Sequence, residues 1–112
     1  YRKELEKTPG IRCHAPSEPK KRNYSYFPIF VDEKYLLTRD QLHEKLKTNG
    51  IYSRRYFYPL ITDFDVFKEN GTGYKNAFPS ARHAAQQVLC LPIHPELSRP
   101  ETKKIIDIIK GT

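Results

Sequence analysis

The sequence predicts a single α/β (α+β) domain, in which helices pack on one face of a small three-stranded sheet. Stretches with apolar residues at helical spacing alternate along the chain with short stretches rich in aromatic and β-branched residues. Two of the helical stretches begin with a capping-box pattern, which marks a helix start in the sequence itself. The 112 residues are enough to enclose one hydrophobic core and too few for two domains.

Residues 1–22 are predicted to lie outside the main domain, which we place at residues 23–112. Residues 1–7 have the composition of a polar helix end, and the Thr-Pro-Gly sequence after them would stop it. Residues 11–23 contain prolines and several charges, which predicts an irregular linker.

The first predicted strand covers residues 24–32, where aromatic and β-branched residues alternate imperfectly with others. Because Pro28 cannot donate to a strand ladder, this strand is expected at an edge or at a bulge. A helix is expected to follow, because Thr38 and Gln41 form a capping box. Its narrow apolar face is formed by Leu42 and Leu46.

The segment Gly50–Leu60, with the sequence GIYSRRYFYPL, is predicted to be the second strand, after a glycine that suits a left-handed helix end. Alternate side chains of a strand point to opposite faces. One predicted face carries Ile51, Ser53, Arg55 and Phe57. The other carries Tyr52, Arg54, Tyr56 and Tyr58. The second face combines a fixed positive charge, phenolic hydroxyls and flat rings, which suits an anionic ligand that also has a ring.

The C-terminal half is predicted to begin with a short helix at residues 63–70 and a glycine-containing loop at residues 71–73. A helix at residues 80–87 then leads into a continuous apolar strand at residues 88–93, which prolines stop. The inward positions of this region are expected to be Ala81, Ala84, Ala85 and Val88.

The last helix is predicted from a second capping box, formed by Ser98 and Glu101, and Gly111 would end it. Its core stripe is expected to be Ile105, Ile108 and Ile109. The chain therefore supplies three predicted strands with helices between them.

Composition excludes several classes of function. The formal net charge is +7, but residues 1–22 hold seven basic and three acidic residues, so the domain itself is only mildly basic. Mean hydropathy is −0.74, and no apolar run approaches the roughly 18 residues of a membrane span. The four histidines are scattered and the two cysteines lack metal-ligand spacing, which predicts no metal site and a reduced, cytoplasmic protein. The chain has no methionine, which predicts a piece of a longer protein.

The sequence shows no self-contained catalytic constellation. It has no glycine-rich phosphate loop and no nucleophile elbow. Asp63 and Asp65 are better placed to cap a helix than to act as an acid–base pair. Cys90 lies in an apolar strand, which favours a packed thiol over a nucleophile. The segment Gly50–Leu60 is therefore the main candidate for a functional site.

Two separated motifs resemble the DegT/DnrJ/StrS family of sugar aminotransferases. Residues 50–60 resemble the family's GI-x-x-R…Y-P-L segment. Residues 78–81 and 88–95 resemble its FP-x-A…VLSLPI-x-P segment. Residues 1–5 resemble the end of the helix that leaves the family's large domain, so that residues 1–22 would be an interdomain helix end and linker. The resemblance covers nearly the whole chain.

The resemblance implies the small C-terminal domain of a fold-type I aminotransferase. The whole enzymes use pyridoxal phosphate on a lysine of the large domain, take an amino group from a donor that is usually glutamate, and pass it to a nucleotide-linked ketosugar. Their active site lies at a homodimer interface. No segment here resembles the cofactor-binding residues, so this chain alone is expected to bind no cofactor and to be inactive. Relatives with histidine in place of the lysine are dehydratases, a choice that this chain does not reveal.

The resemblance also implies which residues face the substrate. Arg54 would pair with the diphosphate, because its fork suits phosphate oxygens. Tyr56 and Tyr58 would donate hydrogen bonds to sugar hydroxyls or to phosphate, although many relatives carry histidine at the position of Tyr56. His94, in the loop after the last strand, is a further candidate for substrate binding. None of these residues is assigned a catalytic role.

Two other functions remain open from the residues alone. A basic α/β domain with exposed aromatic residues can bind single-stranded nucleic acid, although the Gly50–Leu60 segment lacks the RNP pattern. A non-catalytic interaction module with no ligand of its own is the second alternative.

Overall fold

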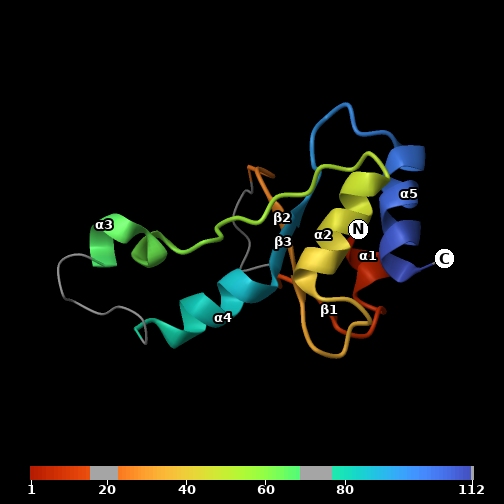
Figure 1. The fold of residues 1–112 in the computed structure, drawn as a ribbon. Coiled ribbons are helices and arrows are strands. Elements are labelled where there is room, and N and C mark those ends of the chain that lie inside the picture. The colour runs from red at the N-terminus through yellow and green to blue at the C-terminus, as the bar shows by residue number, and fades with distance from the viewer. Residues whose placement is uncertain (16–22, 69–76, 112) are drawn as a thin grey trace.

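The computed structural model describes residues 1–15, 23–68 and 77–111 (Figure 1). Its elements in chain order are α1 (Arg2–Leu5), β1 (Ile11–Cys13), β2 (Phe27–Val31), α2 (Arg39–Thr48), the 3-10 turn η1 (Ile61–Asp63), α3 (Asp65–Lys68), α4 (Pro79–Gln87), β3 (Val88–Leu91) and α5 (Arg99–Lys110). Among the described residues, no helix is long and apolar enough to cross a bilayer. The predicted loop at residues 71–73 and the end of the predicted helix at 63–70 lie outside the described residues.

The sheet has three antiparallel strands in the order β1-β2-β3. One of these strands, β1, is Ile11–Cys13. The prediction of an irregular linker at these residues was therefore wrong. The prediction of a strand along Gly50–Leu60 was also wrong, because within the described part of the chain that segment joins the sheet only through a bridge between Arg54 and Cys90. Local composition did not reveal that three residues of the N-terminal segment pair with β2. The predicted boundary after residue 22 stays a prediction, since residues 16–22 lie outside the described part.

Pro28 lies in the central strand but is paired on one side only. It is opposite Cys90 of β3, whereas the pairing with β1 begins at Ile29. At Pro28 the sheet therefore has a local edge, which is the position that a residue without an N–H can occupy.

The hydrophobic core lies between the sheet and the three helices α1, α2 and α5, which gather beside it (Figure 1). The strands contribute Ile11, Cys13, Ile29, Val31, Leu89 and Leu91. The helices contribute Leu5, Leu42, Leu46, Ile105, Ile106 and Ile109. Each strand thus sends alternate residues into one core, and the predicted sheet with helices on one face is confirmed.

Both predicted capping boxes are confirmed. The Thr38 hydroxyl accepts from the Gln41 N–H and the Gln41 side chain accepts from the Thr38 N–H, and Ser98 and Glu101 repeat the arrangement at α5. Gly111 ends α5 in the left-handed conformation, with φ of 76°. These signals are local, so the sequence alone could locate both helix starts.

The inward faces of α4 and α5 differ in part from prediction. Ile106 is buried, whereas Ile108 is only half-buried, because α5 packs against both α1 and α2 and so buries a wider stripe. Ala85 is buried as predicted, but Ala81 is exposed. The first turns of α4, which include Ala81, project away from the sheet (Figure 1).

A projecting arm makes the molecule elongated. We define the arm as residues 57–68 together with α4, which extend to one side of the sheet (Figure 1). The radius of gyration is 15.8 Å, against about 13 Å for a compact chain of this length. An ion pair between Asp63 and Arg82, at 2.9 Å, joins η1 to α4. The arm exposes large apolar side chains, among them Phe57, Ile61, Phe64 and Val66.

Candidate functional site

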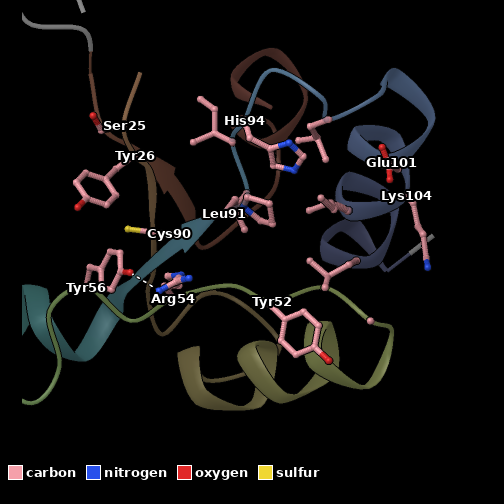
Figure 2. A pocket seen from close by; sticks show the side chains of 16 residues that line it. Ser25, Tyr26, Tyr52, Arg54, Tyr56, Cys90, Leu91, His94, Glu101 and Lys104 are labelled. Atoms are coloured by element: carbon pink, nitrogen blue, oxygen red, sulfur yellow. Dashed lines mark hydrogen bonds between the residues drawn. The ribbon is translucent and has the colours of Figure 1, made fainter. Parts of the chain in front are cut away.

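A cavity of about 630 Å³ opens between residues 50–56, the loop after β3 and the first turns of α5 (Figure 2). Its charged and polar lining includes Tyr52, Arg54, Tyr56, His94, Glu101 and Lys104. Apolar residues at the end of β3 and in the loop after it, among them Leu91, Ile93 and Leu97, also line the cavity. The cavity therefore combines two cations, Arg54 and Lys104, with the carboxylate of Glu101 and with phenol rings.

Arg54 is held at the rim of this cavity by its backbone and by a phenol. Its N–H donates to the Cys90 carbonyl at 3.0 Å, and the Cys90 N–H donates back to the Arg54 carbonyl at 2.7 Å. Its guanidinium Nη1 donates to the Tyr56 hydroxyl at 2.6 Å (Figure 2). Among the described residues, no carboxylate forms an ion pair with Arg54. The charge is thus oriented by neutral groups and can accept an anion.

Tyr56 is oriented by two aromatic contacts as well as by Arg54. Its ring meets Tyr26 edge-on, with centroids 5.4 Å apart, and stacks on Phe57 at 4.8 Å. The Arg54 guanidinium lies 5.6 Å from the centroid of the same ring. These contacts hold the Tyr56 hydroxyl beside the guanidinium, so both groups present hydrogen-bonding atoms at one point of the cavity.

The structure separates Tyr58 from the other predicted site residues. The chain turns after Arg55, with the Tyr58 N–H donating to the Arg55 carbonyl at 2.7 Å. Tyr52, Arg54 and Tyr56 line the cavity together with His94, but Tyr58 does not. The predicted shared face was therefore right for the first three residues and wrong for Tyr58, because the alternation of a strand ends at this turn.

Tyr58 instead belongs to a cluster of charged groups at the start of α2, which we call the Arg39 cluster: Arg39, Asp40, Arg55 and Tyr58. The Tyr58 ring lies 4.7 Å from the Arg39 guanidinium and 5.6 Å from that of Arg55. One oxygen of Asp40 accepts from both arginines, at 2.8 Å and 3.0 Å. Sequence reasoning missed Arg39. The available signal was a cation in the first turn of a helix, where the macrodipole disfavours positive charge.

Burial and charge around this cluster shift the pKa values of two ionisable groups, Asp40 and His43. Partial burial would raise the pKa of Asp40, but the hydrogen bond from Arg55 and the charges of both arginines outweigh it and hold the pKa below its ordinary value. Partial burial, followed by the nearby charge of Arg55, lowers the pKa of His43. The His43 Nδ1 lies 2.9 Å from the Ser53 hydroxyl. The lowered pKa favours the neutral imidazole of His43.

The substitution Asp40→Asn should destabilise the chain at neutral pH but should have little effect on stability in acid. Because the pKa of Asp40 is depressed on folding, its contribution is present above the ordinary carboxyl pKa and disappears as pH falls below about 4. We expect a difference of at most about 1 kcal/mol at pH 7, since water screens an exposed carboxylate. Urea midpoints of both proteins at pH 7 and pH 3 measure it, and an equal difference at the two pH values would refute it.

The described residues offer little for a metal or for a covalently held cofactor. They contain no group of three or more His, Cys, Asp or Glu side chains that could hold a metal ion. Arg39 is the only buried charged side chain among them, so no described lysine lies in the desolvated setting that activates an amine. Burial raises the pKa of Cys90, which keeps its thiol protonated. These residues can bind and orient a ligand, but they do not fit pyridoxal phosphate held as a Schiff base.

The structure is thus a small α/β domain with a cavity lined by charged and aromatic side chains. A model of the DegT/DnrJ/EryC1/StrS aminotransferase family matches residues 1–110, and the chain belongs to this family. The resemblance found in the two sequence motifs is thereby confirmed.

Curated relatives carry the names of sugar transaminases. The chain is 40% identical over 111 residues to a dTDP-4-amino-4,6-dideoxy-D-glucose transaminase of Escherichia coli, covering 99% of this chain and 30% of that protein. It is 43% identical to the protein of the same name from Shigella dysenteriae, covering 98% of this chain and 29% of that protein. The chain thus spans about 30% of the length of these relatives.

Solved structures of the family share the fold. The structure of DesI in the presence of its TDP-sugar product matches with a TM-score of 0.86 and 22% identity, over 98% of this chain and 28% of that chain. The structure of S. venezuelae DesV in complex with a ketimine intermediate matches with a TM-score of 0.82 and 24% identity, over 97% of this chain and 28% of that chain. In both cases the chain matches a little over a quarter of the longer chain and has the same fold as that part.

Proposed function

We propose that this chain is the small domain of a pyridoxal-phosphate-dependent enzyme that transfers an amino group, from glutamate as donor, to a nucleotide-linked ketosugar. Membership of the family supports the reaction class. The names of the relatives, which include a GDP-perosamine synthase of Vibrio cholerae at 31% identity, support a nucleotide-linked sugar as the substrate. Two of these relatives act on dTDP-linked sugars by name, which favours dTDP over GDP here.

One observation carries the role of this domain: Arg54 presents its guanidinium at the cavity with a phenol as its described side-chain partner. A diphosphate oxygen that approaches Arg54 would replace a neutral acceptor by a charged one, which strengthens the hydrogen bond. The Tyr56 hydroxyl, released from Arg54, would then donate to the same phosphate or to a sugar hydroxyl. His94 borders the cavity and is the third substrate-binding candidate.

The cofactor belongs elsewhere in this proposal. Pyridoxal phosphate, when bound, supplies the amino-group transfer chemistry, but the described residues do not fit its attachment. We therefore assign the cofactor to a large domain outside this chain, within a cytoplasmic homodimer. The apolar residues exposed on the arm are suited to pack against that domain. The assignment of residues 23–112 to the small domain is part of the same proposal, with β1 (Ile11–Cys13) completing its sheet.

Arg54→Ala in the full-length protein should weaken binding of dTDP-4-amino-4,6-dideoxy-D-glucose. Losing a hydrogen bond to a charged group costs roughly 1.5–3 kcal/mol, which is about a tenfold to hundredfold rise in the dissociation constant. The dissociation constant of Arg54→Lys should lie between those of the wild type and Arg54→Ala, because lysine keeps the charge but lacks the two-pronged guanidinium. Isothermal titration calorimetry of each purified protein measures the three constants.

Arg12→Ala is the matched control for this experiment. Arg12 is also an exposed arginine above an aromatic ring, 4.7 Å from the centroid of Phe30, but it lies on β1 and does not line the cavity. Its removal should leave the dissociation constant unchanged. Equal constants for the wild type and Arg54→Ala would contradict the role of Arg54.

A further inference from the structure

Arg39 makes an unusual set of contacts for the first residue of a helix. Its side chain is 3% exposed, and one nitrogen, Nη1, donates to the carbonyls of Ala85 at 2.9 Å and Val88 at 3.0 Å. These carbonyls lie at the carboxyl end of α4, where a cation is favourable. A second nitrogen, Nε, donates to Asp40. Arg39 therefore ties the start of α2 to the junction between α4 and β3.

The same guanidinium also reaches the segment that carries Arg54. It lies against the ring of Tyr58, and Asp40 links it to Arg55. Arg55 is the neighbour of Arg54 in the chain, and the turn from Arg55 to Tyr58 encloses Tyr56. Fixing Arg55 and Tyr58 therefore fixes the stretch of backbone from which Arg54 and Tyr56 project.

The two sets of contacts converge on one bridge. Among the described residues, Arg54 joins the sheet only through Cys90, and Cys90 is two residues beyond Val88. Arg39 is bonded at Val88 on one side of this bridge and stacked at Tyr58 on the other. A single pair of backbone hydrogen bonds gives weak support to a functional side chain. A buried guanidinium that contacts the chain on both sides of the bridge fixes the spacing between them.

We propose that Arg39 is a positioning residue for the nucleotide-sugar site: it sets the place of Arg54 at the cavity by holding both sides of the Arg54–Cys90 bridge. This inference rests on the proposed function of Arg54. Lysine cannot replace Arg39, because a single ammonium group lacks the fork that reaches Asp40, two carbonyls and a ring face together.

A double-mutant cycle in the full-length protein tests this proposal, with calorimetric dissociation constants for dTDP-4-amino-4,6-dideoxy-D-glucose as the readout. Misplacement of a binding group by a distant substitution can cost up to roughly a hundredfold, and we expect about a tenfold rise for Arg39→Lys. In the Arg54→Ala background the same substitution should have little effect, because the group that it positions is gone. Arg12→Lys is the matched control and should leave the dissociation constant unchanged in both the wild-type and the Arg54→Ala background.

Each outcome separates positioning from general support of the fold. An unchanged dissociation constant for Arg39→Lys, even with a lower melting temperature, would overturn the proposal. An equal rise with and without Arg54 would overturn it as well, since Arg39 would then act by another route. If Arg54→Ala alone has no effect, the proposed function itself fails, and that result is distinct from the other two.

Tyr58→Leu provides a second test that does not touch the buried guanidinium. The substitution removes the ring that contacts Arg39 and Arg55 but leaves the hydrogen bonds of Arg39 in place. The protein should therefore fold, and this variant can be measured even if Arg39→Lys does not fold. We expect a smaller rise in the dissociation constant, which should again vanish in the Arg54→Ala background. No rise for Tyr58→Leu in a folded protein would contradict the placement of the Arg54 segment by the Arg39 cluster.

Discussion

Gly10→Ala is expected to destabilise this chain by about 3 kcal/mol or more, because it combines a left-handed backbone with a backbone clash. Gly10 has φ of +75°, and a Cβ atom there would lie 2.0 Å from the Tyr35 nitrogen and 2.5 Å from its Cα. Backbone atoms cannot swing aside as a flexible side chain can. The Gly10 carbonyl also accepts the Asp32 N–H at 2.9 Å, so a shift would disturb the connection between β1 and the chain after β2.

Gly50→Ala is the matched control for this substitution. Gly50 has nearly the same φ, +77°, but an added Cβ would meet no atom within 4 Å. It should cost only about 1 kcal/mol, which is the left-handed penalty by itself. Urea denaturation of the two variants and the wild type gives the comparison. Similar midpoints for Gly10→Ala and Gly50→Ala would show that the close approach of Tyr35 does not matter.

Leu46→Ala should be comparably damaging, for a different reason. Leu46 is completely buried in the core between α2, the sheet and α5. Removing its side-chain atoms loses transfer free energy and leaves a cavity, which together cost about 2–5 kcal/mol. The free energy of unfolding from denaturant titration measures the loss.

Leu36→Ala tests whether burial, and not the identity of the residue, determines this cost. Leu36 is 92% exposed, just before α2, so its truncation should change stability by less than about 0.5 kcal/mol. A loss for Leu36→Ala as large as that for Leu46→Ala would contradict the core that the fold defines.

The parts of the fold that the sequence predicted well are those with local causes. The capping boxes at Thr38 and Ser98 involve residues three positions apart, so their patterns are complete within the sequence. Strand pairing has no such local signal. Cys13 faces Ile29 across the sheet, and nothing in residues 11–13 indicates that partner. The aromatic residues of Gly50–Leu60 suit a strand, but in the described part of the chain only Arg54 of this segment pairs with a strand residue.

The same distinction between local signals and long-range contacts applies to the candidate site. Arg54, Tyr56 and His94 were predicted from a motif and lie around one cavity. Arg39 could not be predicted from spacing, because its carbonyl partners are 46 and 49 residues away. Tyr58 was placed with Arg54 by strand alternation, and the turn after Arg55 moved it to the Arg39 cluster. Roles that depend on distant backbone groups therefore required the folded chain.

The structure of the full-length protein with a dTDP-linked sugar bound tests the central claim most directly. We predict a diphosphate oxygen within hydrogen-bonding distance of the Arg54 guanidinium, with the Tyr56 hydroxyl turned from Arg54 to the ligand. A diphosphate bound elsewhere, with Arg54 still donating to Tyr56 as it does here, would contradict the assignment of this domain to the nucleotide-sugar pocket.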